Sequence, residues 1–239
     1  LEESEFLGAI KEVIYDIESY DTTTVRASVG NWLISKYIKE NSNAKVVFNG
    51  DGSDEVTGGY MYFHCAPDEL EFDKECRRLL NDIHYFDVLR SDRSISSHGL
   101  EARTPFLDRS FVQTYLSIPP EIRFHPKYKK CEKYLLRTAF KTMALVPDEI
   151  LLRTKEAVRD GGSKQTRSWF EIIQEHIVKN GGEKYSKMAP KEAEKQYYMD
   201  IFDSYYPGQR DVIPYLWMRK YLDADDASAR TLDVYKKKI

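Results

Sequence analysis

Apolar side chains recur at intervals of three and four residues along most of the chain, which is the spacing that places them on one face of an α-helix. Phe6, Ile10, Val13, Ile14 and Ile17 form such a stripe and predict a helix over residues 4–19. The same periodicity and its boundary residues predict further helices over 24–40, 68–97, 108–117 and 131–143, and a short one after Pro147.

Terminal signals define two later helices. The box Ser168-x-x-Glu171 can satisfy free N–H groups at a helix start, and it predicts a helix that ends near 180–182. Pro190 suits the first turn of a helix running to about 205. Gly99 ends the long helical region, and residues 103–108 form a connector made rigid by Pro105.

One short segment has the pattern of a β-strand. Residues 45–48 (KVVF) are β-branched and apolar at their centre, which predicts an interior parallel strand covered on both faces. An α/β domain with an interior parallel strand needs several such strands. The chain also begins with Leu1 rather than Met. We therefore expect a segment of a longer chain, with the remaining strands before Leu1.

Composition narrows the functional classes. The 239 residues are 41% hydrophobic and carry a formal net charge of −3, which suits one packed domain and gives no sign of a nucleic-acid surface. The sequence has no apolar run long enough to span a membrane and no secretory signal at its start. The three cysteines lack C-x-x-C spacing and the five histidines lack metal spacing, so we expect a reducing cytoplasm and no zinc site.

The strand runs into a loop with the composition of a phosphate site, residues 49–55 (NGDGSDE). Its glycines permit close approach of a ligand, and a helix beginning near Ser53 would point free N–H groups at an anion. The carboxylates of Asp51, Asp54 and Glu55 beside an anion make sense if Mg²⁺ lies between them. The alternative is an ordinary Asp/Gly turn with a Ser/Asp helix cap.

Four other segments carry candidate chemistry, and each has a structural alternative. Thr23 and Arg26 lie at a helix start and could bind a carboxylate or phosphate, or simply cap the helix. Asp87 and Arg90 lie three residues apart, and their structural alternative is that they pair only with each other. For Arg103 the structural alternative is that it only braces the Pro105 turn. Lys155 lies in the loop-like stretch 155–166 and could reach a leaving pyrophosphate, or it could be an ordinary surface lysine.

Several motifs in one order resemble the synthetase domain of glutamine-dependent asparagine synthetases, closest to the eukaryotic branch. The resemblance covers residues 8–235, and it rests on 20–28 (YDTTTVRAS), 49–55, 59–64 (GYMYFH), 98–108 (HGLEARTPFLD), 153–156 (RTKE), 206–208 (YPG) and 228–231 (SART). It implies an α/β fold of the adenine-nucleotide alpha-hydrolase type (a PP-loop ATPase), of which residues 1–239 would be the mostly helical C-terminal portion with few strands, ending in a tail over 232–239.

The resemblance implies ATP, Mg²⁺, aspartate and ammonia as ligands. Aspartate would attack the α-phosphate of ATP to give a β-aspartyl-adenylate and pyrophosphate, and ammonia would then displace AMP. By resemblance, Asp54 would bind Mg²⁺, and Asp51 would lie beside the intermediate. The nucleotide would contact Asn49, Gly50, Gly52 and Ser53. The phosphates would contact Thr23, Arg26 and Lys155, and the substrate aspartate would contact Asp87, Arg90 and Arg103.

The chain departs from the family pattern at two loop positions and in its extent. Asn49 stands where the family usually has Ser, and Asp51 where it has Glu, which shortens the carboxylate by about 1.5 Å. The family's Ser-Gly-Gly-x-Asp-Ser loop and its glutaminase domain are expected in the remaining N-terminal part of the chain's own protein, and a homodimer is compatible with the resemblance. A related adenylating enzyme such as a β-lactam synthetase, or a truncated non-catalytic helical module, remain alternatives.

Overall fold

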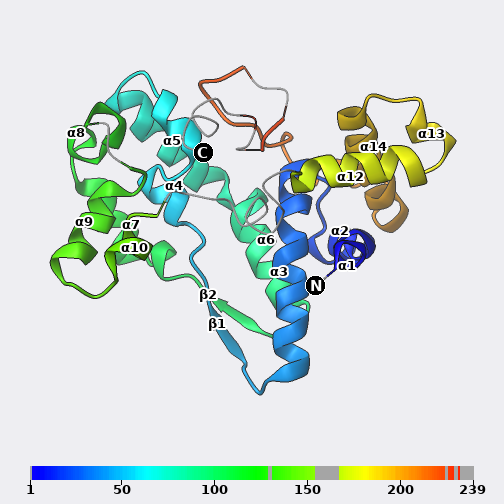
Figure 1. The fold of residues 1–239 in the computed structure, drawn as a ribbon, viewed down its shortest axis with the longest axis horizontal. Coiled ribbons are helices and arrows are strands. Elements are labelled where there is room, and N and C mark those ends of the chain that lie inside the picture. Colours follow the sequence, from blue (N-terminus) through cyan, green and yellow to red (C-terminus); the bar gives the residue numbers. More distant parts are fainter. Residues whose placement is uncertain (1, 129–130, 154–166, 224–225, 229–230, 232–239) are drawn as a thin grey trace.

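Helices make up most of the structure, a computed structural model that describes residues 2–128, 131–153, 167–223, 226–228 and 231 (Figure 1). The α-helices are α1 Glu3–Gly8, α2 Ile10–Ile17, α3 Thr22–Asn41, α4 Ser53–Thr57, α5 Glu69–Asp82, α6 Asp87–Ser96, α7 Arg109–Ser117, α8 Pro120–Arg123, α9 Tyr134–Thr142, α10 Asp148–Leu151, α12 Trp169–Asn180, α13 Glu183–Ser186 and α14 Pro190–Tyr205. The strands are β1 Val46–Phe48 and β2 Glu101–Arg103, and the 3₁₀ turns are η1 Met61–Cys65, η2 Ile83–Tyr85, η3 Pro105–Leu107, η4 His125–Tyr128 and η5 Arg210–Val212.

The predicted helices are confirmed, although two of them are interrupted. The helix predicted over 4–19 divides at Ala9 into α1 and α2. The region 68–97 divides into α5, η2 and α6, because the backbone of Phe86 has φ −127° and ψ −94°, outside the helical region. The capping box at Ser168 is present and opens α12, and Pro190 begins α14.

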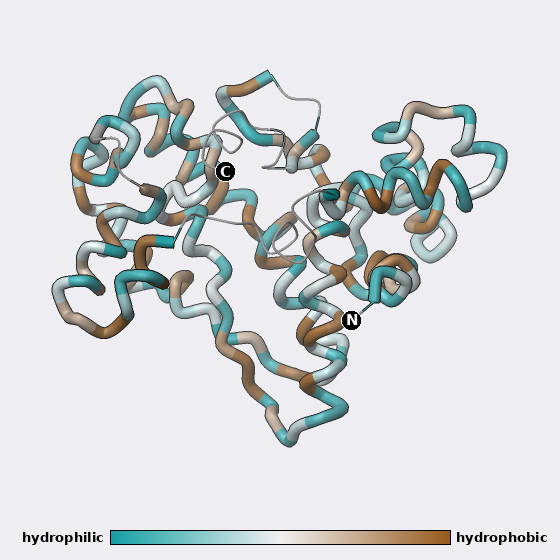
Figure 2. Tube along the Cα trace, viewed as in Figure 1, coloured by the Kyte–Doolittle hydropathy of each residue, from teal (hydrophilic) through white to brown (hydrophobic). Residues whose placement is uncertain are grey.

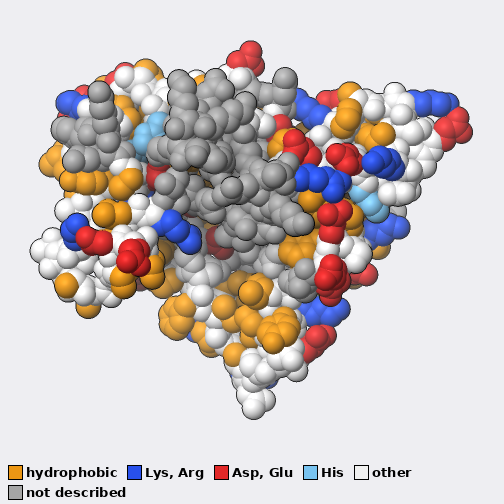
Figure 3. Space-filling model, viewed as in Figure 1, with side chains coloured by type: hydrophobic (Ala, Val, Ile, Leu, Met, Phe, Trp, Pro, Cys, Tyr) orange, Lys and Arg blue, Asp and Glu red, His pale blue; other side chains and the backbone are white. Residues whose placement is uncertain are grey.

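β1 and β2 form a parallel pair in which Val47 lies opposite Ala102 and Phe48 opposite Arg103. β2 was not predicted from the sequence, because three residues with charged ends show no apolar alternation. The prediction that β1 is covered on both faces is wrong for the described residues, since Phe48 is 76% exposed and Val46 44%. Figure 2 shows the apolar residues of β1 at the lower end of the molecule, and Figure 3 shows hydrophobic side chains on the surface there.

Two hydrophobic clusters lie on either side of α6. The first joins α2, α3, α12 and α14, and the second joins η1 and α5 with Phe86 and Phe124. The described residues 213–223, 226–228 and 231, which we call the C-terminal segment, take part in both. Ile213 packs into the first cluster, whereas Trp217 and Ala227 pack into the second. No helix among the described residues has the length and apolar character that crossing a bilayer requires.

Candidate active site

The loop after β1 lies at the carboxyl end of both parallel strands, where open α/β sheets bind their ligands. The amide of Asn49 donates to the carbonyl of Arg103 at 2.9 Å, which ties the start of the loop to the end of β2. Gly52 has φ +85° and is packed against Leu107, so a side chain here would be strained and would collide with that leucine. α4 begins directly afterwards at Ser53, as predicted.

Asn49 fixes the loop through its side chain. Its Nδ2 donates to Ser91 Oγ on α6 at 2.5 Å, and its Oδ1 accepts from the amide of Asp51 at 3.1 Å. Ser91 is buried. The side chain of Asn49 therefore links α6, through Nδ2, to the backbone of the loop, through Oδ1. Ser91 was not predicted as a site residue, because a serine within a helix carries no signal of its own.

Asp51, Asp87 and Arg90 come together in the structure. Arg90 Nη2 lies 3.2 Å from Asp51 Oδ1 and 2.8 Å from Asp87 Oδ1, so one guanidinium bridges the loop and the first turn of α6. Burial opposes the charge of Arg90, but the two carboxylates outweigh it and raise the pKa of this arginine. The carboxylates keep partly exposed faces, with 21% of Asp51 and 23% of Asp87 accessible to solvent.

Lys133 lies against the loop and was missed by the sequence analysis. Its Nζ lies 3.0 Å from Asp54 Oδ1 and donates to Ser53 Oγ at 2.6 Å. Lys133 has φ +58° and occupies the N-cap position of α9. Gly59 makes room for the pair, because a Cβ there would lie 2.6 Å from Lys133 Cε and would overlap Asp54 Oδ1. No local pattern marks this lysine, since its partners lie about 80 residues earlier.

Glu55 points away from solvent beside these groups. It is 2% exposed, and the hydroxyl of Tyr60 donates to its carboxylate. Burial raises the pKa of Glu55 well above 4.5, and the negative charges of Asp87 and Asp54 raise it further. Because Asp87 and Asp54 act on the same buried carboxyl, the acidic side chains of the loop and of α6 share one electrostatic environment.

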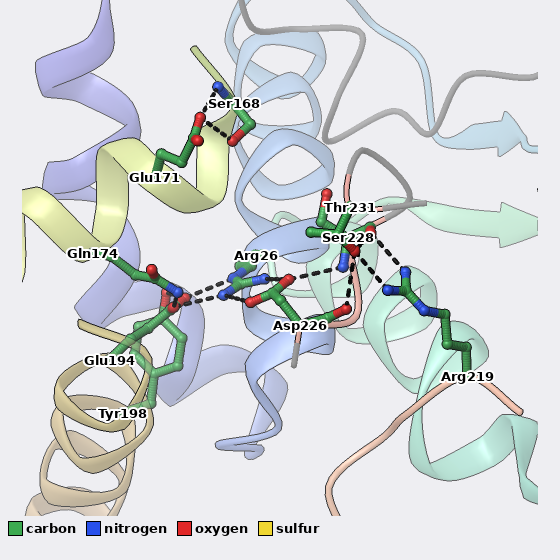
Figure 4. A network of polar contacts seen from close by, with 10 residues as sticks. All are labelled: Arg26, Ser168, Glu171, Gln174, Glu194, Tyr198, Arg219, Asp226, Ser228 and Thr231. Carbon is green, nitrogen blue, oxygen red and sulfur yellow. Dashed lines mark hydrogen bonds and ion pairs between the residues drawn. The ribbon is translucent and has the colours of Figure 1, made fainter. Parts of the chain in front are cut away.

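Arg26 lies in a buried ion-pair network (Figure 4). Its Nε and Nη2 donate to the Glu194 carboxylate at 2.7 and 2.6 Å. Its Nη1 and Nη2 donate to the Asp226 carboxylate, both at 2.8 Å. Arg26 is 2% exposed. Burial opposes its charge, but Glu194 and Asp226 raise the pKa of Arg26 well above its usual range.

The remaining predicted residues are more dispersed. Thr23 lies half-buried in the first turn of α3, whose N-cap is Asp21. Arg103 pairs with Glu101 at 2.6 Å within β2, and its side chain is 56% exposed. Gly50 is exposed at the tip of the loop. Lys155 lies outside the described residues.

The described residues contain no group of three or more His, Cys, Asp or Glu side chains that could hold a metal ion. Asp54 still fits a Mg²⁺–nucleotide complex, because Mg²⁺ in such sites takes one or two carboxylates and completes its shell with phosphate oxygens and water. Its 17% exposure leaves an accessible face, and Lys133 already neutralises it.

Comparison with known proteins identifies the family. The sequence profile of the asparagine synthase family matches residues 1–73 and 65–223. Glutamine-hydrolysing asparagine synthetases from Homo sapiens and Gallus gallus are each 47% identical over 98% of this chain. The enzyme from Cricetulus griseus is 48% identical over 97% of it. The chain spans 42–43% of the length of these relatives. It belongs to the asparagine synthase family.

Proposed function

We propose that this chain contributes to ATP-dependent conversion of aspartate to asparagine through a β-aspartyl-adenylate. The observation that carries the proposal is the charge arrangement at the carboxyl end of the two strands. Arg90 bridges Asp51 and Asp87, and Lys133 neutralises Asp54 at the start of α4. Two cations thus lie among acidic groups on the loop that the family resemblance assigns to the nucleotide.

The chemistry requires this mixture of charges. The aspartate carboxylate and the triphosphate are both anions, so cationic groups must stabilise the charge that concentrates as they meet. A Mg²⁺ ion bound with the nucleotide would neutralise phosphate oxygens, and Asp54 would hold it. The flexible side chain of Lys133 would then reach a second anion besides Asp54, namely a phosphate of the nucleotide. Arg90 would keep Asp51 oriented toward the reacting groups, although Asp is shorter than the Glu that the family usually has there.

A longer protein is part of the same proposal. Because the chain spans 43% of its human relative, the pyrophosphate loop and a glutaminase would come from sequence N-terminal to residue 1. Residues 1–239 would then be the C-terminal portion of the synthetase domain, with 232–239 as a tail. Its substrates would be aspartate, ATP and ammonia, its ammonia would come from glutamine, and its location would be the cytoplasm.

Aspartate-dependent ATP–pyrophosphate exchange by the full-length protein tests the proposal. We expect Asp54→Asn to lower the exchange rate by about 10²–10³-fold, and Lys133→Met by about 10²-fold, because each removes a preorganised charge from the reacting phosphates. The exposed pair formed by Lys141 and Asp148 provides matched controls, since its atoms are 2.9 Å apart on α9 and α10.

The outcomes separate the parts of the proposal. Lys141→Met and Asp148→Asn should leave exchange unchanged. Exchange retained by Asp54→Asn would overturn the magnesium assignment alone. An absence of aspartate-dependent exchange in the unmodified full-length protein would overturn the function and would favour a non-catalytic helical module.

A further inference from the structure

Arg26 connects three parts of the molecule. One edge of its guanidinium holds Glu194 on α14, and Glu194 also accepts from Gln174 at 3.0 Å and from Tyr198 at 3.1 Å. The other edge holds Asp226 in the C-terminal segment. Glu194 is fully buried, and Asp226 is 12% exposed. Two bidentate pairs on one guanidinium fix the segment to α3 and α14 with defined geometry.

A second anchor lies five residues before Arg26. Asp21 is fully buried, and its two oxygens have separate partners. Oδ2 accepts from the amide of Thr24 and caps α3, whereas Oδ1 accepts from the amide of Trp217 at 2.7 Å. Asp21 and Arg26 therefore hold the C-terminal segment at two points, Trp217 and Asp226.

The segment is also tied to itself between these points. Asp226 Oδ1 accepts from the amide of Ser228 at 2.8 Å, and the carbonyl of Ser228 accepts from Arg219 Nη1 at 2.7 Å. Arg219 Nη2 reaches Thr231 Oγ1 at 2.5 Å. Figure 4 shows Arg219 and Asp226 meeting on opposite sides of Ser228. Ser228 therefore links Asp226 to Arg219, which lies two residues from Trp217.

Trp217 connects the segment to the candidate site. Its ring lies 6.1 Å from that of Tyr60 and 6.3 Å from that of Tyr62. Tyr60 stacks on Tyr62 with centroids 5.9 Å apart, and its hydroxyl donates to Glu55. Glu55 follows Asp54 in the first turn of α4. A continuous set of contacts thus runs from Arg26 to the turn that carries the proposed magnesium ligand.

We propose that Arg26 and Asp226 are positioning residues that hold the α4 turn in place through Trp217, Tyr60 and Glu55. Four of the five N–H donors of Arg26 already bond to carboxylates, so bidentate contact with a phosphate would require breaking a buried ion pair. The expected effect of this positioning on catalysis rests on the proposed function. The contacts from Arg26 to Glu55 do not depend on that function.

Asp226→Asn tests the inference, with Asp223→Asn as the control because Asp223 is exposed on the same segment. In the full-length protein we expect Asp226→Asn to lower kcat for pyrophosphate exchange by about tenfold, since small misplacements of catalytic groups have effects of this size or larger. In a Tyr60→Phe background, which removes the bond to Glu55, Asp226→Asn should cause little further loss. A merely structural role would instead reduce kcat equally in both backgrounds.

Two further measurements test the positioning role without depending on the proposed function. In this 239-residue chain, hydrogen–deuterium exchange of residues 49–59 should increase in Asp226→Asn and not in Asp223→Asn. Unchanged exchange in both would overturn the positioning role even if the full-length protein is inactive. Tighter binding of magnesium pyrophosphate by Asp226→Asn would also overturn it, because Asp226 would then be competing with the ligand for Arg26.

Discussion

Glu55 shows how the candidate site is linked to stability. Its carboxyl is buried next to Asp54 and Asp87, so the neutral form is favoured and its pKa lies well above 4.5. The folded protein therefore binds a proton at Glu55 more tightly than the unfolded chain does. By linkage, the contribution of this proton to stability is fully present below the unfolded pKa and is lost as pH rises from about 4.5 through the folded pKa.

Glu55→Gln should remove that pH dependence. The amide keeps the acceptor for Tyr60 but carries no ionisable proton, so the variant should be more stable than the original chain at pH 7.5 and closer to it at pH 5. Urea unfolding of the chain at the two pH values measures the difference. Parallel losses of stability in both proteins between pH 5 and 7.5 would show that Glu55 does not titrate in that window.

Individual site residues differ in how far the sequence reveals them. Asn49, Asp51 and Asp54 lie in one glycine-rich loop, so composition and spacing were enough to group them. The pairing of Asp87 with Arg90 follows from helical spacing. Lys133 and Ser91 could not be found this way, because their contacts with the loop join residues about 80 and 42 positions apart. Arg26 was placed on a helix start correctly, but its partners Glu194 and Asp226 depend on tertiary packing.

Among the elements, α3 and α14 are joined by charge within an apolar cluster. Removing Arg26 would leave the carboxylates of Glu194 and Asp226 without their cation, whereas removing the charge of Glu194 would leave Arg26 paired with Asp226. We therefore expect Arg26→Met to destabilise the chain by about 3–5 kcal/mol and Glu194→Gln by less, about 2 kcal/mol.

The critical result is which substitution, Arg26→Met or Glu194→Gln, destabilises the chain more. Urea unfolding midpoints of the two variants measure this. The exposed pair of Arg210 and Asp203 serves as the control, since its side chains are 43% and 34% accessible. Arg210→Met should cost less than about 1 kcal/mol. A larger loss for Glu194→Gln than for Arg26→Met would mean that Asp226 does not compensate Arg26 in solution.

Element boundaries follow local chemistry where a strong terminal signal is present. Ser168 and Pro190 located the starts of α12 and α14, because capping and a fixed φ act within one turn. The break at Phe86 has no comparable signal, since the apolar stripe continues across it. β2 was missed for a different reason. Its three residues become a strand only because β1 lies beside them, and that pairing spans 55 positions from Val46 to Glu101.

At the scale of the whole molecule, the two strands form a sheet that is too small to be stable alone. An isolated pair of strands is marginal in water, and here Phe48 and Val46 of β1 are 76% and 44% exposed. The sequence pattern of β1 is that of a strand covered on both faces. This disagreement between pattern and exposure is consistent with the proposal of a longer protein, whose further elements would pack on this surface.

Phe48→Ala distinguishes the two situations. In the 239-residue chain, Phe48 is 76% exposed, so its loss should change stability by less than about 0.5 kcal/mol. In the full-length protein, packing against further elements would bury the ring, and the same substitution should cost about 3–5 kcal/mol. Leu70→Ala on α5 is the matched control, because Leu70 is 61% exposed and lies on a different surface, and it should be nearly neutral in both proteins. Equal, small effects of Phe48→Ala in both would mean that β1 remains at an exposed face of the complete protein.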